Sequence, residues 1–331
     1  MKLSKFFATV LLGGTLLMAR AQEGVAYHGD PIPPEIEAAY VRGLNYLVRT
    51  QGADGGWSQS GGESGPGITG LALLAILAHG EDPNYGPYAK TVQRAVDNLL
   101  KSQDAKTGYM GHSMYHHGFA TLALAEAYGV VRNPKLGPAL RKAVDLILTS
   151  QKMNPHGGWR YSPNASDADT TVSGAQMVAL FAARNAGIAV PDEAIKRGLE
   201  YYRSCQEANG GIGYTSPGGG NTTRTAIGAL VAALAKRKDT HLFNNAWNYL
   251  RQERGGRDGS YYFYTLYYQA QALFQSDMQE WRAWNDQNFR ELASVQGADG
   301  AWTGQFGPGF CTSAALLSMA LNYRFLPIYE R

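Results

Sequence analysis

The segment around residues 167–171 holds the side chains best suited to acid chemistry. Asp167 and Asp169 are two residues apart and are followed by Thr170, at the start of an apolar run with helical periodicity. A carboxyl group buried in such a place has a raised pKa and can act as a general acid. An Asp directly before a helix can instead cap it by accepting hydrogen bonds from the first backbone N–H groups. Both roles remain open for Asp169.

Two adjacent histidines form the second group of candidate residues. His116 and His117 precede another apolar segment, much as Asp169 and Thr170 precede theirs. If the two segments lie side by side, His117 and Asp169 can form a hydrogen bond and set each other's protonation. Asp169 and His117 are therefore the candidate catalytic pair, with His116, Asp167 and Thr170 as candidate ligand-binding neighbours. As the alternative, both histidines are ordinary turn residues.

Aromatic and charged residues in other apolar segments extend this set. Tyr264, Tyr267 and Tyr268 replace aliphatic residues, and aromatic faces can stabilise a cation while their hydroxyls bind a polar group or a sugar. Core packing explains such tyrosines equally well. Glu126 lies within an otherwise apolar segment, where it either faces a cavity or pairs locally.

Two residues before a further apolar helix could hold a charged head group. Thr222 and Arg224 are two residues apart, and the Arg guanidinium suits an anionic group. An exposed Arg with no ligand is the ordinary alternative. We count both as candidate ligand-binding residues.

An internal repeat carries all of these candidates. Each copy has a charged helix ending in Gln, a Gly-rich turn with an aromatic residue, and a second helix rich in Ala and Leu. The repeat glutamines are separated by 44 to 55 residues, which leaves room for two helices and two connections. Copies are expected near residues 36–80, 88–129, 137–187, 192–236, 242–275 and 281–326.

The repeated Gln and aromatic residues have a structural explanation. A buried Gln side chain can satisfy free backbone groups at a helix end, and an aromatic ring can fill the space under a Gly turn. We assign this role to the following residues: Gln51, Trp57, Gln103, Gln151, Trp159, Gln206, Gln252, Gln296 and Trp302.

The difference between the two helices of each copy predicts the fold. The charged first helix belongs outside and the uncharged second helix inside. Open arrays need polar terminal repeats, yet the last inner helix is as apolar as the central ones. The sequence therefore predicts an all-α (α/α)6 toroid of six helical hairpins over residues 35–331.

Aligning the inner helices on their small residues places the candidates in the ring. The aligned column consists of Thr69, Ala120, Ser173, Thr225, Tyr268 and Thr312. The polar candidates lie three to four residues upstream of this column in copies two to five. In a closed ring they should gather around one mouth, at the N-termini of the inner helices.

The Gln and Gly-x-Trp pattern resembles the QW repeat of squalene and oxidosqualene cyclases, and the repeat architecture is similar to the β-subunit of protein prenyltransferases. The resemblance covers residues 35–329. Residues 167–171 also resemble the DxDD motif with which class II terpene cyclases protonate an alkene, which implies Asp169 as the general acid. Thr170 stands where that motif has its last Asp. The Asp-x-Cys pair of the prenyltransferase zinc site is absent, so no metal is expected.

The first residues predict export. Lys2 and Lys5 precede an apolar run over residues 6–18, and small residues follow at the spacing that signal peptidase reads. The run is shorter than the roughly 20 apolar residues of a spanning helix. We therefore expect a signal peptide at residues 1–21, a linker at 22–34, and a periplasmic or extracellular protein with no membrane span after cleavage.

Composition limits the partners and cofactors. The formal net charge is +3, with no basic run, so a nucleic-acid partner is not expected. Cys205 and Cys311 form no CxxC or zinc-like spacing, and the sequence does not decide whether they pair. No cofactor is expected.

Three functions remain. The first is a toroid that binds an isoprenoid or another apolar ligand in a central cavity. The second is a class II cyclase-like enzyme that uses Asp169 as its acid. The third is a scaffold that binds an exported protein or a glycan.

Overall fold

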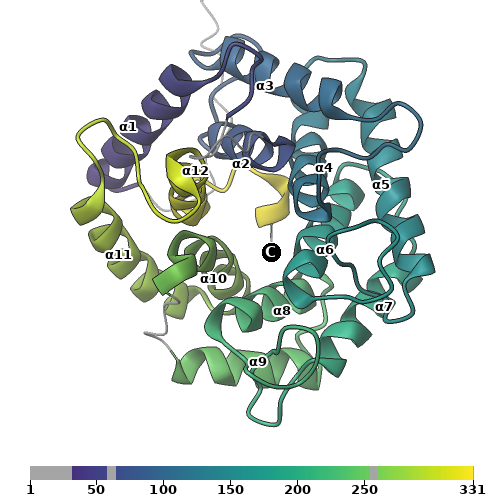
Figure 1. The fold of residues 1–331 in the computed structure, drawn as a ribbon. Helices are drawn as coiled ribbons and strands as arrows, with labels where there is room; N and C mark the ends of the chain where they lie inside the picture. The colour runs from purple at the N-terminus through teal and green to yellow at the C-terminus, as the bar shows by residue number, and fades with distance from the viewer. Residues whose placement is uncertain (1–31, 58–64, 254–258, 331) are drawn as a thin grey trace, which may run out of the picture.

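The computed structural model describes residues 32–57, 65–253 and 259–330. The expected signal peptide, and the expected linker up to residue 31, lie outside these ranges. Within them, twelve α-helices alternate between an outer and an inner ring (Figure 1). Three short 3-10 helices complete the structure: η1 (Gly259–Tyr261), η2 (Ala320–Asn322) and η3 (Pro327–Tyr329).

The outer helices are amphipathic. In α3, Val92, Ala95, Val96 and Leu99 are buried along one face, because residues three and four apart share a side of a helix. The remaining residues of these helices are largely polar and meet solvent. The outer helices are α1 (Pro34–Thr50), α3 (Ala89–Ser102), α5 (Leu136–Met153), α7 (Asp192–Ser204), α9 (His241–Gln252) and α11 (Met278–Val295).

The inner helices are buried on nearly all sides. Every residue of α2 is buried, as expected for a helix enclosed by neighbours. Each inner helix packs against two others, and α12 packs against α2, which closes the ring. The predicted α/α toroid is thus confirmed. The inner helices are α2 (Pro66–Leu77), α4 (Met114–Tyr128), α6 (Thr170–Asn185), α8 (Thr222–Leu234), α10 (Tyr262–Ser276) and α12 (Gly307–Met319).

The repeat glutamines join neighbouring hairpins. The side-chain amide of Gln151 donates to the carbonyl of Gly157 in its own turn, at 2.8 Å, and to that of Ala194 in the next outer helix, at 2.9 Å. Gln296 does the same with Gly300 and Ala39, and so links the last repeat to the first. Three further glutamines bridge their own turn and the next outer helix in this way: Gln51, Gln103 and Gln206.

The repeat tryptophans fasten each turn to its own outer helix. The indole N–H of Trp159 donates to the carbonyl of Ile147 at 2.9 Å, and its backbone N–H donates to the hydroxyl of Ser173 at 2.9 Å. The turn is therefore held between the outer and the inner helix of its hairpin. Trp57 and Trp302 make equivalent contacts.

The fifth hairpin departs from this pattern. Gln252, the last residue of α9, is exposed, unlike the fully buried Gln151. Sequence similarity alone gave both glutamines the same structural role. The two glutamines differ in burial, since the side chain of Gln151 is enclosed and that of Gln252 is exposed to solvent.

The C-terminal segment closes one end of the ring, where the inner helices end. Figure 1 shows the C-terminus near the ring axis. Gln275, near the end of α10, donates to the backbone carbonyl of Glu330 at 2.9 Å. The carboxyl of Glu126, near the end of α4, accepts from the backbone N–H of Ile328. Tyr329 is buried in the same place.

The described residues also bear on the predictions about a membrane span and a disulfide bond. None of their helices is long and apolar enough to cross a membrane. Cys205 and Cys311 are both buried and carry free thiols.

Replacing a bridging glutamine should destabilise the ring. Gln151→Leu leaves two buried carbonyls without their donor, so we expect the free energy of unfolding to fall by about 2–3 kcal/mol. Gln252→Leu, at an exposed position, should change it by less than about 0.5 kcal/mol. Urea unfolding of both variants measures the difference. Equal effects would contradict the bridging role.

Glu126 should make stability depend on pH. Burial raises the pKa of its carboxyl to about 8, and Glu330 adds to the rise. The unfolded chain loses this proton at a lower pH, so stability should fall as pH rises from the unfolded pKa through about 8. Between pH 5 and 7 this contribution should fall by about 2 kcal/mol, measured as the difference in stability between the wild type and Glu126→Gln. Glu126→Gln should remove this part of the pH profile, and a variant profile identical to that of the wild type would refute the assignment.

Candidate functional site

A cavity of about 630 Å³ lies inside the ring, near the N-termini of the inner helices. All six inner helices contribute residues from their first two turns, so the cavity occupies the end opposite the C-terminal segment. Most of the wall is apolar or aromatic, including Ile68, Leu71, Tyr115, Phe119, Tyr264 and Phe310. Such a lining suits a ligand with a large apolar surface.

Aromatic rings from opposite sides of the ring form the floor. The ring centroids of Phe119 on α4 and Tyr267 on α10 are 6.0 Å apart, and those of Tyr115 and Tyr264 are 6.4 Å apart. Helices α4 and α10 face each other across the axis (Figure 1). Their side chains meet in the middle and separate the cavity from the end that holds Glu126.

The mouth of the cavity is more polar than the floor. Arg224 lines it and is held by the backbone carbonyls of Ile212, at 3.2 Å, and Gly219. Tyr161 and Tyr214 also line it, with their hydroxyl oxygens 2.6 Å apart. The guanidinium of Arg160 lies 5.0 and 5.1 Å from the centroids of these two rings. Arg224 and two phenols thus line the entrance, while Arg160 contacts the phenol rings and lies beside the carboxylates of Asp167 and Asp169.

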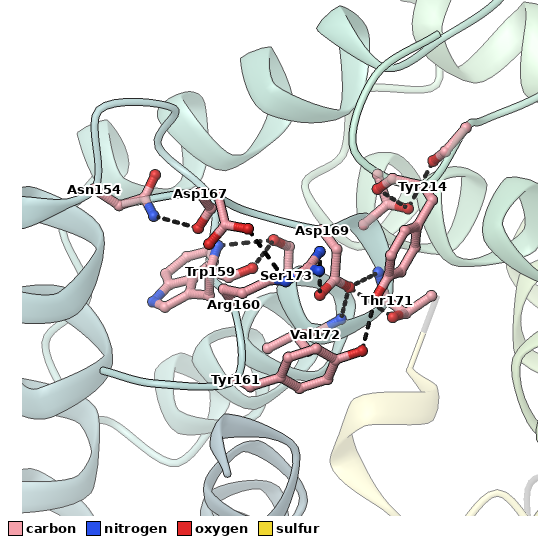
Figure 2. Close-up of polar contacts among 12 residues, drawn as sticks. Asn154, Trp159, Arg160, Tyr161, Asp167, Asp169, Thr171, Val172, Ser173 and Tyr214 are labelled. Atoms are coloured by element: carbon pink, nitrogen blue, oxygen red, sulfur yellow. Dashed lines mark hydrogen bonds and ion pairs between the residues drawn. The ribbon is translucent and has the colours of Figure 1, made fainter. Parts of the chain in front are cut away.

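Asp169 caps helix α6, as Figure 2 shows. Its Oδ1 accepts from the backbone N–H groups of Thr171, at 2.9 Å, and Val172, at 2.8 Å, and from the hydroxyl of Thr171, at 2.6 Å. Its Oδ2 lies 3.5 Å from Nη1 of Arg160. The alternative drawn from the sequence, an N-cap, therefore describes what the Asp169 side chain does in the structure.

The protonation of Asp169 is set by opposing effects. The side chain is fully buried, and this burial raises the pKa of the carboxyl above its usual value. The hydrogen bonds from Thr171 and Val172 and the charge of Arg160 act in the lowering direction without cancelling the effect of burial. Asp169 does not line the cavity, whereas Thr171 does. The carboxyl lies behind Thr171, one hydrogen bond from the cavity wall.

The expected pair of His117 and Asp169 is not formed. His117 Nδ1 accepts from the backbone N–H of Met110 at 3.2 Å, and Nε2 lies 3.0 Å from the carbonyl of Ala143. In other repeats a hydroxyl accepts from the turn in the same way, as Ser173 does from Trp159. The second repeat has Ala120 in the aligned column, and its methyl group cannot accept a hydrogen bond. His117 takes this place one helical turn earlier, which corrects the alignment.

Three of the predicted ligand-binding residues line the cavity, namely His116, Arg224 and Tyr264. Asp167 is exposed instead, with its Oδ2 3.4 Å from Nε of Arg160. Thr170 is buried, and its hydroxyl donates to the carbonyl of Gly213 at 2.8 Å. Asp167 and Thr170 therefore have partners in and around the turns and do not face the cavity.

The other predicted residues lie behind or away from the cavity wall. Thr222 is buried at the start of α8, and its neighbour Thr223 lines the cavity in its place. Tyr267 and Tyr268 are buried beneath the cavity and pack against each other with ring centroids 4.7 Å apart. Glu126 faces the opposite end, beside the C-terminal segment.

Much of the aromatic wall was missed by the sequence analysis. In α4, Tyr115 lies one residue before His116 and Phe119 lies two residues after His117. Phe306 and Phe310 lie at the start of the last inner helix, α12. Aromatic residues in the first turns of α4, α10 and α12 were the available signal.

The described residues include no group of three or more His, Cys, Asp or Glu side chains placed to hold a metal ion. The thiol of Cys311 is buried, and this burial raises its pKa to about 11. A thiol of this kind is a poor metal ligand and nucleophile, because both roles need the thiolate.

Comparison with known proteins gives one curated relative, and no family model matches the chain. A squalene hopane cyclase from Aspergillus fumigatus is 34% identical over 90 residues. The match covers 23% of this chain and 11% of that protein, so the chain spans only a small part of its relative.

Solved structures match almost the whole toroid. An α-1,6-mannanase variant from Salegentibacter, in complex with α-1,6-mannotriose, has a TM-score of 0.64 at 11% identity and covers 87% of this chain and 99% of its own. The type II terpene cyclase MstE from Scytonema has a TM-score of 0.62 at 16% identity and covers 89% and 100%. A further MstE variant, with a TM-score of 0.60 at 15% identity and coverages of 88% and 98%, holds its substrate geranylgeranyl dihydroxybenzoate.

These likenesses establish the fold and leave the activity open. The neighbours share the α/α toroid, which confirms the family resemblance at the level of architecture. One neighbour acts on a glycan and another on a prenylated molecule, according to their names. A fold shared by such different enzymes does not determine the reaction.

His117 should remain neutral in the folded protein. Burial lowers the pKa of its imidazole to about 4, while the unfolded chain binds the proton near pH 6.5. The neutral imidazole of His117 stabilises the folded protein at pH values above the unfolded pKa. This stabilisation should be lost as pH falls from about 6.5 toward 4. Between pH 7 and 5 the contribution of His117 should fall by about 2 kcal/mol, measured as the difference in stability between the wild type and His117→Gln, because Glu126 acts in the opposite direction over the same range. An NMR titration in which the His117 ring protonates near pH 6.5 would overturn this.

Proposed function

We propose that this protein binds an isoprenoid or a similarly apolar molecule in the cavity at the open end of its toroid. The observation that carries the proposal is the aromatic and aliphatic wall, built by all six inner helices around about 630 Å³. Burying apolar surface against such a wall is favourable by about 25 cal/mol per Å². Because the wall belongs to a closed ring, it is formed before the ligand arrives.

The polar mouth supports a ligand with one polar end. Arg224 is fixed by two backbone carbonyls, so its charge stays at the entrance without cost to the ligand. Tyr161 and Tyr214 add hydroxyls to the lining of the same cavity. An anionic or strongly polar head group would meet Arg224 while the apolar part enters the cavity.

The lining also supports binding over hydrolysis. Within the described part of the chain, none of the residues that line the cavity is Asp or Glu. Glycoside hydrolysis in most families needs two carboxyl groups that flank the scissile bond. The cavity lining therefore gives no support to glycoside hydrolysis, and its apolar wall favours an apolar ligand over a glycan.

A class II cyclase-like reaction is the second candidate, because of Asp169. Its carboxyl is buried with a raised pKa and is 2.6 Å from the hydroxyl of Thr171, which lines the cavity. Protonation of an alkene would have to pass from Asp169 to the ligand past Thr171. The three hydrogen bonds that Oδ1 accepts favour the carboxylate and oppose this role.

We further propose that residues 1–21 are a secretion signal and that the toroid acts outside the cytoplasm. The charged and apolar pattern of the sequence carries this part of the proposal. N-terminal sequencing of the secreted protein should begin at Gln22.

The binding proposal predicts selective loss of ligand when the cavity is filled. We would add a lipid extract to the purified protein and measure retained molecules by native mass spectrometry. Leu71→Trp places a larger side chain in the cavity wall and should reduce retention at least tenfold. Val48→Trp, on the exposed side of α1, is the matched control and should retain ligand like the wild type.

Asp169→Asn separates binding from catalysis. Cyclisation leaves the mass unchanged, so the extracted ligand is compared by chromatography before mass detection. Retention of the same compound by wild type and Asp169→Asn supports binding. A compound of equal mass but new retention time, formed by the wild type alone, supports the cyclase. If no protein retains a ligand, both cavity functions fail and the scaffold remains.

A further inference from the structure

A second hollow of about 420 Å³ lies beside the central cavity, between the fifth and sixth hairpins. We call it the side hollow. Its wall includes Phe263 at the start of α10, Val295 at the end of α11 and Cys311 on α12. Phe263 and Cys311 are buried, whereas Val295 is 59% exposed. The side hollow therefore runs from the interior toward the outer surface of the ring.

The two hollows share a partition made of two aromatic rings. Tyr261 and Phe306 line both the central cavity and the side hollow. Their ring centroids are 5.7 Å apart and their planes are tilted by 37°. Tyr261 is 44% exposed. A side chain this exposed changes rotamer on the ps–ns timescale, so the partition can open without moving a helix.

The charges differ between the two compartments. Arg224 stands at the mouth of the central cavity, and the charged residue in the described lining of the side hollow is Glu291. An anionic head group is attracted to Arg224, whereas the described lining of the side hollow includes no Lys, Arg or His. The thiol of Cys311 has a pKa of about 11 and packs as an apolar group. Six of the described lining residues present apolar or aromatic surface and four are polar, so the side hollow suits an uncharged chain; the apolar and aromatic ones are Tyr261, Tyr262, Phe263, Val295, Phe306 and Cys311, and the polar ones are Glu291, Ser294, Thr303 and Gln305.

A glycine keeps the side hollow open. A Cβ atom added at Gly304 would lie 3.1 Å from Phe263 and 3.2 Å from the Sγ of Cys311, so a side chain there would enter this space. The φ angle of Gly304 is not positive, and the backbone alone does not require glycine.

We propose that the ligand is a chain-like amphiphile that occupies both compartments. Its anionic head lies beside Arg224, its first apolar part fills the central cavity, and its tail passes between Tyr261 and Phe306 into the side hollow. The inference rests on the proposed binding function and adds to it the length and polarity of the ligand.

A series of 4-alkylbenzoates with alkyl chains of 4 to 12 carbons tests this length. Binding to the intact protein is measured by titration calorimetry. Each methylene that becomes buried should lower Kd about fourfold, so affinity should keep rising through the longest chains that reach the side hollow. In Gly304→Leu the rise should stop at a shorter chain, with at least a tenfold loss for the longest compound and no loss for the shortest.

Two further variants keep the test decisive. Gly129→Leu adds the same side chain where nothing lies within 4 Å, and it should bind every compound like the wild type. Val295→Trp blocks the side hollow from its exposed end and should reproduce the effect of Gly304→Leu if that variant does not fold. Failure of all benzoates to bind the wild type overturns the proposed function. The wild type could bind the short chains while the blocked variants lose the same affinity at every chain length, or lose none. Either result overturns the two-compartment ligand and leaves the proposed binding function standing.

Discussion

The fold depends on one hydrogen-bonding arrangement, the Gln side chain that ends an outer helix and joins two hairpins. Its amide nitrogen has two hydrogens, and the structure uses one for the turn of the same hairpin and one for the next outer helix. A buried amide with both donors paired pays no desolvation penalty for them. Because Gln296 makes the same contacts with Gly300 and Ala39, the last hairpin is joined to the first and the ring closes.

Closure determines where a site can form. The six inner helices point the same way, so their N-termini surround one mouth, while the C-terminal segment occupies the other end. Aromatic rings from α4 and α10 meet across the axis and divide the interior between these ends. The interior is therefore not an open channel along the ring axis.

The polar residues at the inner-helix starts serve two purposes that are easily confused. Ser173 and its equivalents in other repeats accept from the turn backbone and hold the hairpin together, and His117 does so in the second repeat. Asp169 caps α6 next to them. The cavity itself is lined by neighbours such as Tyr115, His116 and Thr171. Successive helical residues are separated by about 100° around the axis, so adjacent positions have different surroundings.

The sequence by itself determined the repeats, their inner and outer helices and the closed ring, since these follow from hydrophobic periodicity and from residues that recur at a fixed place in each copy. It also identified Asp169 as a possible cap, because capping is a local interaction. Only the tertiary structure decided that Gln252 is exposed while Gln151 is buried, and that His117 bonds to Met110 and Ala143 instead of Asp169. It alone revealed the aromatic wall, the partition of Tyr261 and Phe306, and the side hollow. The rotation of each inner helix about its own axis determines which of its side chains face the cavity. That rotation depends on packing against both neighbouring inner helices in the ring, so the sequence of a single repeat does not determine it.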